Sequence, residues 1–245
     1  MLINPWTLVW SDEFDVDGLP DPKKWTYEFG HIRNEELQYY TVGKKENSRV
    51  EGGNLVIECR KEADGQITSA SLITLGKASW KYGRFEMRAK VPAGKGTWPA
   101  IWMMGTDRPK VGWPFCGEID IMEYVGFDPN KVHGTVHFPA NDPARPKLLN
   151  LSKGSNLTID SPVADSFHVY AVEWSAEKLV FYFDGKMYFS FKNDGSESNG
   201  FKFDKEVYLL MNLAFGGTWG ASKGVDMASL PAKYLIDYVR IYKAS

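Results

Sequence analysis

Apolar and polar residues alternate along most of this chain, and the alternation predicts short β-strands. The clearest case is 83–91, GRFEMRAKV, where the odd positions are apolar and all four even positions are charged. The dipeptide Asp184-Gly185 separates two such runs and predicts a tight hairpin turn. A period of two also marks the runs 55–59, 167–174, 179–183, 186–191, 207–214 and 234–242. No long segment shows the 3.6-residue apolar period of a helix, so the sequence predicts an all-β protein.

Many short strands separated by Gly and Pro are typical of two antiparallel sheets packed as a sandwich, one face of which can curve into a groove. We find no internal repeat, linker or low-complexity tract, so residues 1–245 are expected to form a single domain. The stretch 139–166 contains four Pro and many polar residues. It is expected to be a long loop near one edge of the groove.

Composition limits the function classes. The net charge is −2 and no basic stripe is visible, so nucleic acid is not an expected partner. No run of eighteen apolar residues is present, and a membrane is not expected either. Nine Trp exceed what a core requires, and sugar faces are natural partners for exposed indoles. Cys59 and Cys116 are expected to be buried free thiols rather than a disulfide.

The most informative run is EIDIME at 118–123, where three carboxylates lie in an apolar strand-like segment. Side chains on a strand alternate between faces, so Glu118 and Asp120 point the same way. Strict alternation would turn Glu123 to the other face. A β-bulge at 121–122 would bring Glu123 back to the face of the other two acids, with one of the two bulge residues in the core.

Such an arrangement has a chemical consequence. Burying acids beside one another raises the pKa of at least one of them. A carboxylate beside a protonated carboxylic acid is the equipment of a retaining glycoside hydrolase. The alternative is an ordinary amphipathic strand with one wet face. Like charges stacked on an exposed strand repel, and the flanking aromatic and Gly residues also favour a functional site.

Aromatic residues surround the acidic run in the sequence. Trp98 and Trp102 lie upstream in GTWPAIWMM, and Trp113 lies five residues before Glu118. Each could be packed in the core, but three indoles near buried acids favour one or two as platforms for sugar rings. The apolar C–H face of a pyranose stacks on indole while its hydroxyls stay free to hydrogen-bond.

Two further segments offer polar side chains. In 131–137, His133 and His137 share one face, and a neighbouring strand position would let a His contact Asp120 or substrate. A structural role is the alternative for each His. A zinc site from both is not expected, because HxxxH on a strand does not bring two rings to one metal. Asn212 falls on the polar face of its strand and could hydrogen-bond a sugar hydroxyl.

With these motifs, the chain resembles glycoside hydrolase family 16, in its laminarinase-type, bulged form. The resemblance covers nearly the whole chain. The landmarks occur in the family's order: WSDEF at 10–14, ELQYYT at 36–41, YGRFE at 82–86, WPAIW at 98–102, EIDIME at 118–123, GTVH at 134–137 and the segment 212–219.

The resemblance implies a concanavalin-like β-jelly roll with an open groove, and retaining endo-hydrolysis of β-1,3-glucan or mixed β-1,3/1,4-glucan. It implies that Glu118 is the nucleophile, Glu123 the general acid/base and Asp120 the helper between them. It also implies sugar contacts from Asn34, Arg84, Trp98, Trp102, Trp113, His137, Asn212 and Trp219.

No cofactor is implied for catalysis. The family often carries a structural calcium ion on the convex side, and Glu13, the backbone of Gly53 and Asp237 resemble its ligands. These are oxygen donors, as a hard cation requires. Plain surface acids are the alternative for Glu13 and Asp237.

The chain also departs from the family pattern. Asn34 is followed by Glu35 where many laminarinases have a second Asn, and the stretch 139–166 has no clear match. The linkage preference therefore stays open. So do a transglycosylase, a galactan hydrolase, which would favour more basic residues at the groove, and a non-catalytic carbohydrate-binding module. The expected partner is β-glucan, bound by a monomer.

The expected location is outside the cell, in the periplasm or at the cell surface. Residues 1–6, MLINPW, do not form a signal peptide, so a secreted enzyme would be represented by its mature part. An intracellular protein would need no such explanation.

Overall fold

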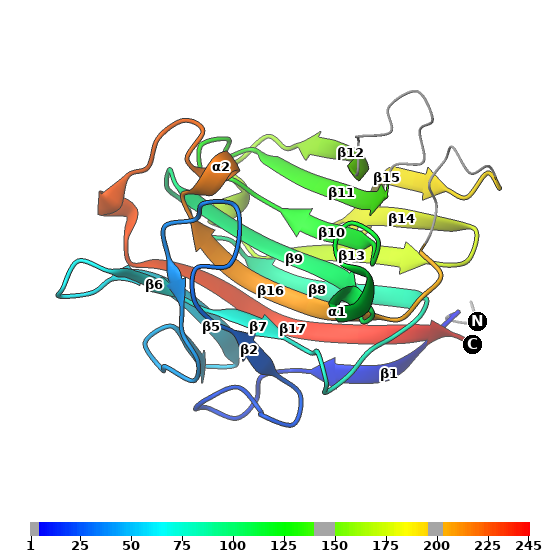
Figure 1. The fold of residues 1–245 in the computed structure, drawn as a ribbon, viewed down its shortest axis with the longest axis horizontal. Coiled ribbons are helices and arrows are strands. Elements are labelled where there is room, and N and C mark those ends of the chain that lie inside the picture. The colour runs from blue at the N-terminus through cyan, green and yellow to red at the C-terminus, as the bar shows by residue number, and fades with distance from the viewer. Residues whose placement is uncertain (1–4, 140–149, 196–202) are drawn as a thin grey trace.

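The structure, a computed structural model, describes residues 5–139, 150–195 and 203–245. It is a sandwich of two β-sheets, drawn as stacked layers in Figure 1. The larger sheet has the spatial order β15 (Lys186–Lys192), β14 (Lys178–Phe183), β13 (His168–Trp174), β8 (Gly83–Lys90), β17 (Ala232–Ala244), β5 (Asn54–Lys61), β6 (Ile67–Ser69) and β3 (Tyr39–Tyr40), with β1 (Trp6–Asp12) on β17 and β4 (Ser48–Glu51) on β5.

The smaller sheet carries the site described below. Its order is β12 (Asn150–Thr158), β11 (Lys131–Pro139), β10 (Glu118–Glu123), β9 (Thr97–Gly105), β16 (Val207–Phe215), β7 (Ser71–Ile73) and β2 (Thr26–Glu28). All its pairings are antiparallel, and in the larger sheet only β3 and β6, among the described strands, pair in parallel. Short helices α1 (Arg108–Val111), α2 (Gly217–Gly220), η1 (Val163–Asp165) and η3 (Met227–Ser229) lie in the connections.

The predicted all-β jelly roll is confirmed, and the reason is visible in the burial of the strands. On β8 the exposure alternates residue by residue, with Phe85 and Met87 fully buried between the sheets. The predicted hairpin joins β14 to β15, where Asp184 and Gly185 both have positive φ, as a tight two-residue turn requires. The first and last strands pair with each other, so the two ends of the described part of the chain lie side by side (Figure 1).

The expectation of a loop over 139–166 is wrong in part. Residues 150–158 form β12, which pairs with β11 along nine residues at the edge of the smaller sheet. Its sequence, NLSKGSNLT, is mostly polar and half exposed, and only its two leucines, Leu151 and Leu157, pack against the core. Edge strands of this kind give no alternating signal. Residues 140–149 lie outside the described residues.

Both cysteines are free and buried, as predicted. Cys59 lies in the main core, and Cys116 lies in a smaller apolar cluster with Trp102 and Met104 beneath the outer face of the smaller sheet. Among the described residues, no helix is long and apolar enough to cross a membrane.

Candidate active site

The three acids of β10 lie on the outer face of the smaller sheet, and a bulge puts them there. The pairing of β10 with both neighbouring strands shifts register between Asp120 and Glu123. On β9, Trp102 lies opposite Asp120 and Ala100 lies opposite Glu123. The predicted bulge is therefore confirmed, and it turns Glu123 to the same side as the other acids.

The bulge differs from the prediction in one detail. Ile121 and Met122 are both buried in the core with Ile119, whereas only one bulge residue was expected there. Two consecutive side chains on the inner side are what an extra residue allows, because it interrupts the strict alternation. Three apolar contacts thus anchor the strand that presents the acids.

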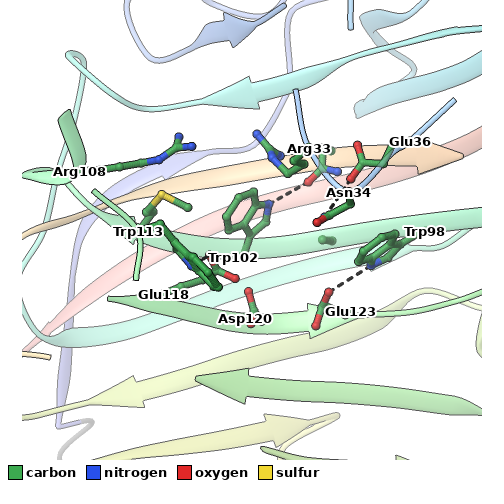
Figure 2. Close-up of a pocket in the computed structure, with 13 residues that line it drawn as sticks. Arg33, Asn34, Glu36, Trp98, Trp102, Arg108, Trp113, Glu118, Asp120 and Glu123 are labelled. Carbon is green, nitrogen blue, oxygen red and sulfur yellow. Dashed lines mark hydrogen bonds between the residues drawn. The ribbon is translucent and has the colours of Figure 1, made fainter. Parts of the chain in front are cut away.

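The acids open into a pocket of about 300 Å³ on this face. Figure 2 shows Glu118, Asp120 and Glu123 in a row along β10. Trp102 lies between this row and the opposite side of the pocket, where Arg33 and Arg108 are found. The residues lining the pocket are Arg33, Asn34, Glu36, Trp98, Ala100, Trp102, Met104, Arg108, Trp113, Glu118, Asp120, Glu123 and Asn212.

Each of the two glutamates on β10 receives one indole hydrogen bond. Trp113 Nε1 donates to Glu118 Oε2 at 3.0 Å, and Trp98 Nε1 donates to Glu123 Oε1 at 3.1 Å (Figure 2). These bonds fix one oxygen of each carboxylate and leave the other available for chemistry. Two of the predicted tryptophans therefore act on the acids directly.

His137 lies beside the same acids, as predicted. Its Nε2 is 3.3 Å from Asp120 Oδ2 and 3.9 Å from Glu118 Oε1. The reason is register, since β11 pairs with β10 and places His137 opposite Glu118. His133, opposite Glu123, instead packs its ring edge-on against Trp219, with 4.9 Å between centroids.

Burial and mutual repulsion raise the pKa of all three acids. Desolvation is the largest cause for each. The charge of Asp120 adds to it at Glu118, that of Glu123 at Asp120, and that of Glu118 at Glu123. The site therefore keeps at least one acid protonated near neutral pH, as a proton donor must be.

Asn212 holds the floor of the pocket together. Its Oδ1 accepts a 2.8 Å hydrogen bond from Trp102 Nε1, and its Nδ2 donates to the Tyr40 hydroxyl at 2.9 Å. Asn212 is buried and lines the pocket, so a sugar reaches only the part of the amide that these bonds leave open.

The remaining tryptophans differ in what they expose. Trp113 is 46% exposed, so it offers a free face for stacking. Trp102 is nearly buried, and the Arg33 guanidinium lies over its ring at 4.9 Å from the centroid. Trp102 is therefore a floor residue rather than an open platform. Trp219 packs edge-on against Trp98, with 5.5 Å between centroids, and is absent from the pocket lining.

Sequence reasoning missed several residues of the β2–β3 connection. Glu36 lines the pocket next to the predicted Asn34, and Asn34 Nδ2 donates to Glu36 Oε1 at 3.2 Å. Gln38 Nε2 donates to Glu36 Oε2 at 2.7 Å and fixes it from behind. The motif ELQYYT marked this segment, but nothing in its pattern showed which side chains turn toward the acids.

Arg33 and Arg108 were also missed. Arg33 forms an ion pair with Glu28 and lines the pocket beside Trp102. Arg108 comes from the first turn of α1 and reaches the same side of the pocket (Figure 2). Neither lies in an alternating pattern, so only the path of the connections places them.

The predicted sugar contact from Arg84 is wrong. Arg84 lies on the solvent side of β8 in the larger sheet, so the whole core separates it from the pocket. Its guanidinium instead binds Glu86 at 2.7 Å and Glu173 at 2.8 Å. Three of the four charged residues of β8, Arg84, Glu86 and Arg88, form ion pairs on this outer face, which explains their spacing without a ligand.

Two of the three predicted calcium ligands, the carboxylates of Glu13 and Asp237, are bound by arginines, and no described contact tests the third, the backbone of Gly53. Arg240 binds both carboxylate oxygens of Glu13, at 3.0 and 2.8 Å, and Arg88 binds Asp237 at 2.5 Å. Both carboxylates offer oxygen ligands, but each is already bound by a positively charged guanidinium in the place that a metal cation would take. The arrangement does not fit a calcium ion as it stands, and calcium binding stays a prediction.

Comparison with known proteins identifies the family of this site. The family model described as Glycosyl hydrolases family 16 matches residues 35–240, which include the acids and most of the pocket. The chain belongs to glycosyl hydrolase family 16. A beta-glucanase of Rhodothermus marinus is 49% identical over 250 residues, covering 97% of this chain and 85% of that protein.

Solved structures agree with this family assignment. The laminarinase from Rhodothermus marinus superposes with a TM-score of 0.89 at 46% identity, over 98% of each chain. A mutant of SCLam, a non-specific endo-β-1,3(4)-glucanase, superposes with a TM-score of 0.88 at 44% identity, over 98% of this chain and 95% of that one. That mutant was co-crystallised with 1,3-β-D-cellotriosyl-glucose. This family 16 chain is therefore a glycosidase by fold, site and relatives.

Proposed function

We propose that the chain is a retaining endo-glucanase that cleaves β-1,3-glucan and also accepts mixed β-1,3/1,4-glucan. The observation that carries the proposal is the row of three buried acids on the bulged β10, with an indole hydrogen bond to each glutamate. A module that only binds carbohydrate has no use for three desolvated acids.

The geometry supports the following steps of hydrolysis. Glu123, whose pKa is raised by burial and by the charge of Glu118, donates its proton to the glycosidic oxygen. Glu118 attacks the anomeric carbon as the bond to the leaving group breaks, which forms a glycosyl-enzyme. Glu123 then takes a proton from water, the water oxygen bonds to the anomeric carbon, and Glu118 leaves. Two inversions give net retention, for which carboxyl groups ~5–5.5 Å apart are typical.

Asp120 and His137 support Glu118 in this scheme. Asp120 lies between the two glutamates along the strand, and His137 Nε2 approaches both Asp120 and Glu118. A proton held among these groups can move away from Glu118 when it must be ionised. They are positioning and pKa-setting groups rather than the reacting atoms.

The choice of substrate rests on the relatives. A laminarinase and a non-specific endo-β-1,3(4)-glucanase resemble this chain over nearly all its length. The exposed face of Trp113 at the pocket rim is suited to a glucosyl ring of either linkage. We further propose that the protein works as a monomer and outside the cytoplasm, because its substrate is a polymer that does not cross membranes.

The test is release of reducing sugar from laminarin, barley mixed-linkage glucan and agarose, with Glu118→Ala as the inactive control. We expect release from both glucans, none from agarose, and a loss of at least about 10³-fold in the variant. Arg49→Gln, which changes an ion-paired arginine on β4 of the other sheet, should keep full activity. Activity of Glu118→Ala near that of the parent would refute the assignment.

A second measurement separates hydrolysis with retention from its alternatives. NMR of the first products should show the β-anomer before mutarotation. Added azide should restore turnover of an aryl β-glucoside substrate by Glu118→Ala and give an α-glycosyl azide, because the anion replaces the missing carboxylate. Transfer to an added sugar acceptor in place of water would instead identify a transglycosylase.

A further inference from the structure

One group of side chains in the pocket has the composition and spacing of a transition-metal site. Glu118, Asp120 and His137 each offer a ligand atom, and the three atoms lie within 4.8 Å of one another. His137 Nε2 and Asp120 Oδ2 are 3.3 Å apart. In a tetrahedral zinc site with bonds of ~2.0–2.1 Å, neighbouring ligand atoms are about 3.3–3.4 Å apart. The pair is already at that spacing.

The shortest of these contacts lacks hydrogen-bond geometry. Asp120 is 3% exposed, and its Oδ2 has no hydrogen-bond partner among the described residues, although His137 Nε2 is close. A buried oxygen acceptor without a donor is costly. A proton or a cation between Oδ2 and Nε2 would satisfy both atoms. A cation that takes the place of this proton therefore finds two ligand atoms already close together.

The other ring nitrogen of His137 is positioned as in many metal sites. The Asn150 amide lies 3.4 Å from His137 Nδ1, and Asn150 Oδ1 is buried without a partner. Rotating the amide by half a turn about its last side-chain bond exchanges its two ends and lets Oδ1 accept a hydrogen bond from Nδ1–H. That bond places the proton on Nδ1 and leaves the Nε2 lone pair directed at the acids, as a metal ligand requires.

The ligand set selects the class of cation. One imidazole and two carboxylates suit Zn²⁺, whereas Mg²⁺ and Ca²⁺ prefer six or more oxygens. Glu118 and His137 are 16% and 23% exposed, so an ion entering the pocket can reach them. Arg33 lies across Trp102 from these acids, so its charge opposes the cation without blocking it.

We propose that Glu118, Asp120 and His137 form an inhibitory binding site for Zn²⁺. The inhibition rests on the proposed function, because the ion would bind the carboxylate that attacks the anomeric carbon. The binding of Zn²⁺ itself does not depend on the proposed function. A bound ion takes the place of the sugar's anomeric centre, so it competes with the glucan. No histidine pair is needed, and His133 takes no part.

Calorimetric titration of metal-free protein with ZnCl₂ at pH 7 tests the site directly. The parent should bind one Zn²⁺. In His137→Gln the affinity for Zn²⁺ should fall by more than the roughly 10–100-fold that follows the loss of a group hydrogen-bonded to a ligand. Asp120→Asn is a second ligand change. The matched control is His168→Gln, since His168 Nδ1 lies 2.7 Å from Asp184 Oδ2 and no third described ligand group joins that pair. It should bind Zn²⁺ as the parent does.

Laminarin hydrolysis adds the second readout. Zn²⁺ should raise KM without lowering kcat, EDTA should reverse the effect, and equal Mg²⁺ or Ca²⁺ should have none. Unchanged Zn²⁺ affinity in both His137→Gln and Asp120→Asn, with unchanged melting temperatures, would overturn the proposal. A parent that binds Zn²⁺ but cleaves no glucan would support the site and refute the proposed function, so the two failures are distinguishable.

Discussion

Trp113 donates its indole hydrogen bond to Glu118 at 3.0 Å while almost half of its own surface stays exposed. One residue thus performs two tasks, because its nitrogen lowers the pKa of the carboxylate and its ring remains free to meet a sugar. The two tasks are separable by substitution.

Trp113→Phe should keep the stacking face and lose the hydrogen bond. The hydrogen bond stabilises ionised Glu118, so its loss raises the pKa of Glu118. The acidic limb of the kcat/KM profile on laminarin should then move to higher pH, with KM nearly unchanged. Trp113→Ala should move the same limb and also raise KM. A KM increase in the Phe variant with an unmoved acidic limb would contradict this division of tasks.

Arg33 should also affect the acidic limb of the kcat/KM profile, through its charge rather than through a hydrogen bond to Glu118. It does not bond to Glu118, but its positive charge lowers the pKa of that carboxyl. In Arg33→Met the limb should move to higher pH, and in Arg33→Lys it should stay nearer the parent's position. Because Arg33 is paired with Glu28, the variant is best made together with Glu28→Gln, which avoids a buried unpaired charge. Identical pH profiles in the double variant and in Glu28→Gln alone would exclude the effect.

Ionisation of the buried acids should also lower the free energy of unfolding at high pH. In the folded state the pKa of Glu123 is raised, first by burial and then by Glu118. A raised pKa in the folded state means that folding favours the protonated form of Glu123. The contribution of Glu123 to stability is therefore complete below its pKa in the unfolded chain, ~4.3. It is lost as the pH rises through its pKa in the folded protein. Wild-type stability should therefore fall between about pH 4 and the folded-state pKa.

Glu123→Gln removes that loss. Its melting temperature should match that of the parent near pH 4 and exceed it by a few degrees at pH 8, where about 1 kcal/mol corresponds to ~2–4 °C. Activity should fall by about 10²–10⁴-fold, because the proton donor is gone. Asp64→Asn, a change of an exposed loop acid, is the control for general charge effects. A melting difference between Glu123→Gln and the parent that does not change with pH would argue against the raised pKa.

The sequence predicts most of the fold and the acidic row because both depend on local alternation. Glu118 and Asp120 share a face by periodicity alone, and the family resemblance supported the bulge that brings Glu123 to them. The edge strand β12 was missed because it pairs with β11 through its backbone, while its only two apolar residues, Leu151 and Leu157, lie six positions apart and make no alternating pattern.

The other errors arise from tertiary position. Arg84 and Arg33 are both arginines in family landmarks or beside them, yet one lies on the convex sheet and the other in the pocket. The alternation on β8 shows that Arg84 points away from the core, but it does not show which sheet β8 joins. The path of the β2–β3 connection, which carries Arg33 and Glu36 to the acids, leaves no periodic signal.

Arg84→Gln tests this correction. The parent side chain is 17% exposed and binds Glu86 and Glu173, so its loss removes the ion-pair partner of two partly buried carboxylates, each of which keeps a tyrosine hydroxyl donor. We expect a loss of about 1 kcal/mol in the free energy of unfolding, measured by urea denaturation. Since the core separates Arg84 from the pocket, kcat and KM on laminarin should equal those of the parent. Arg33→Met serves as the comparison, because it removes an arginine of equal exposure that does line the pocket. A kcat/KM loss in Arg84→Gln as large as that in Arg33→Met would restore the original expectation of a sugar contact.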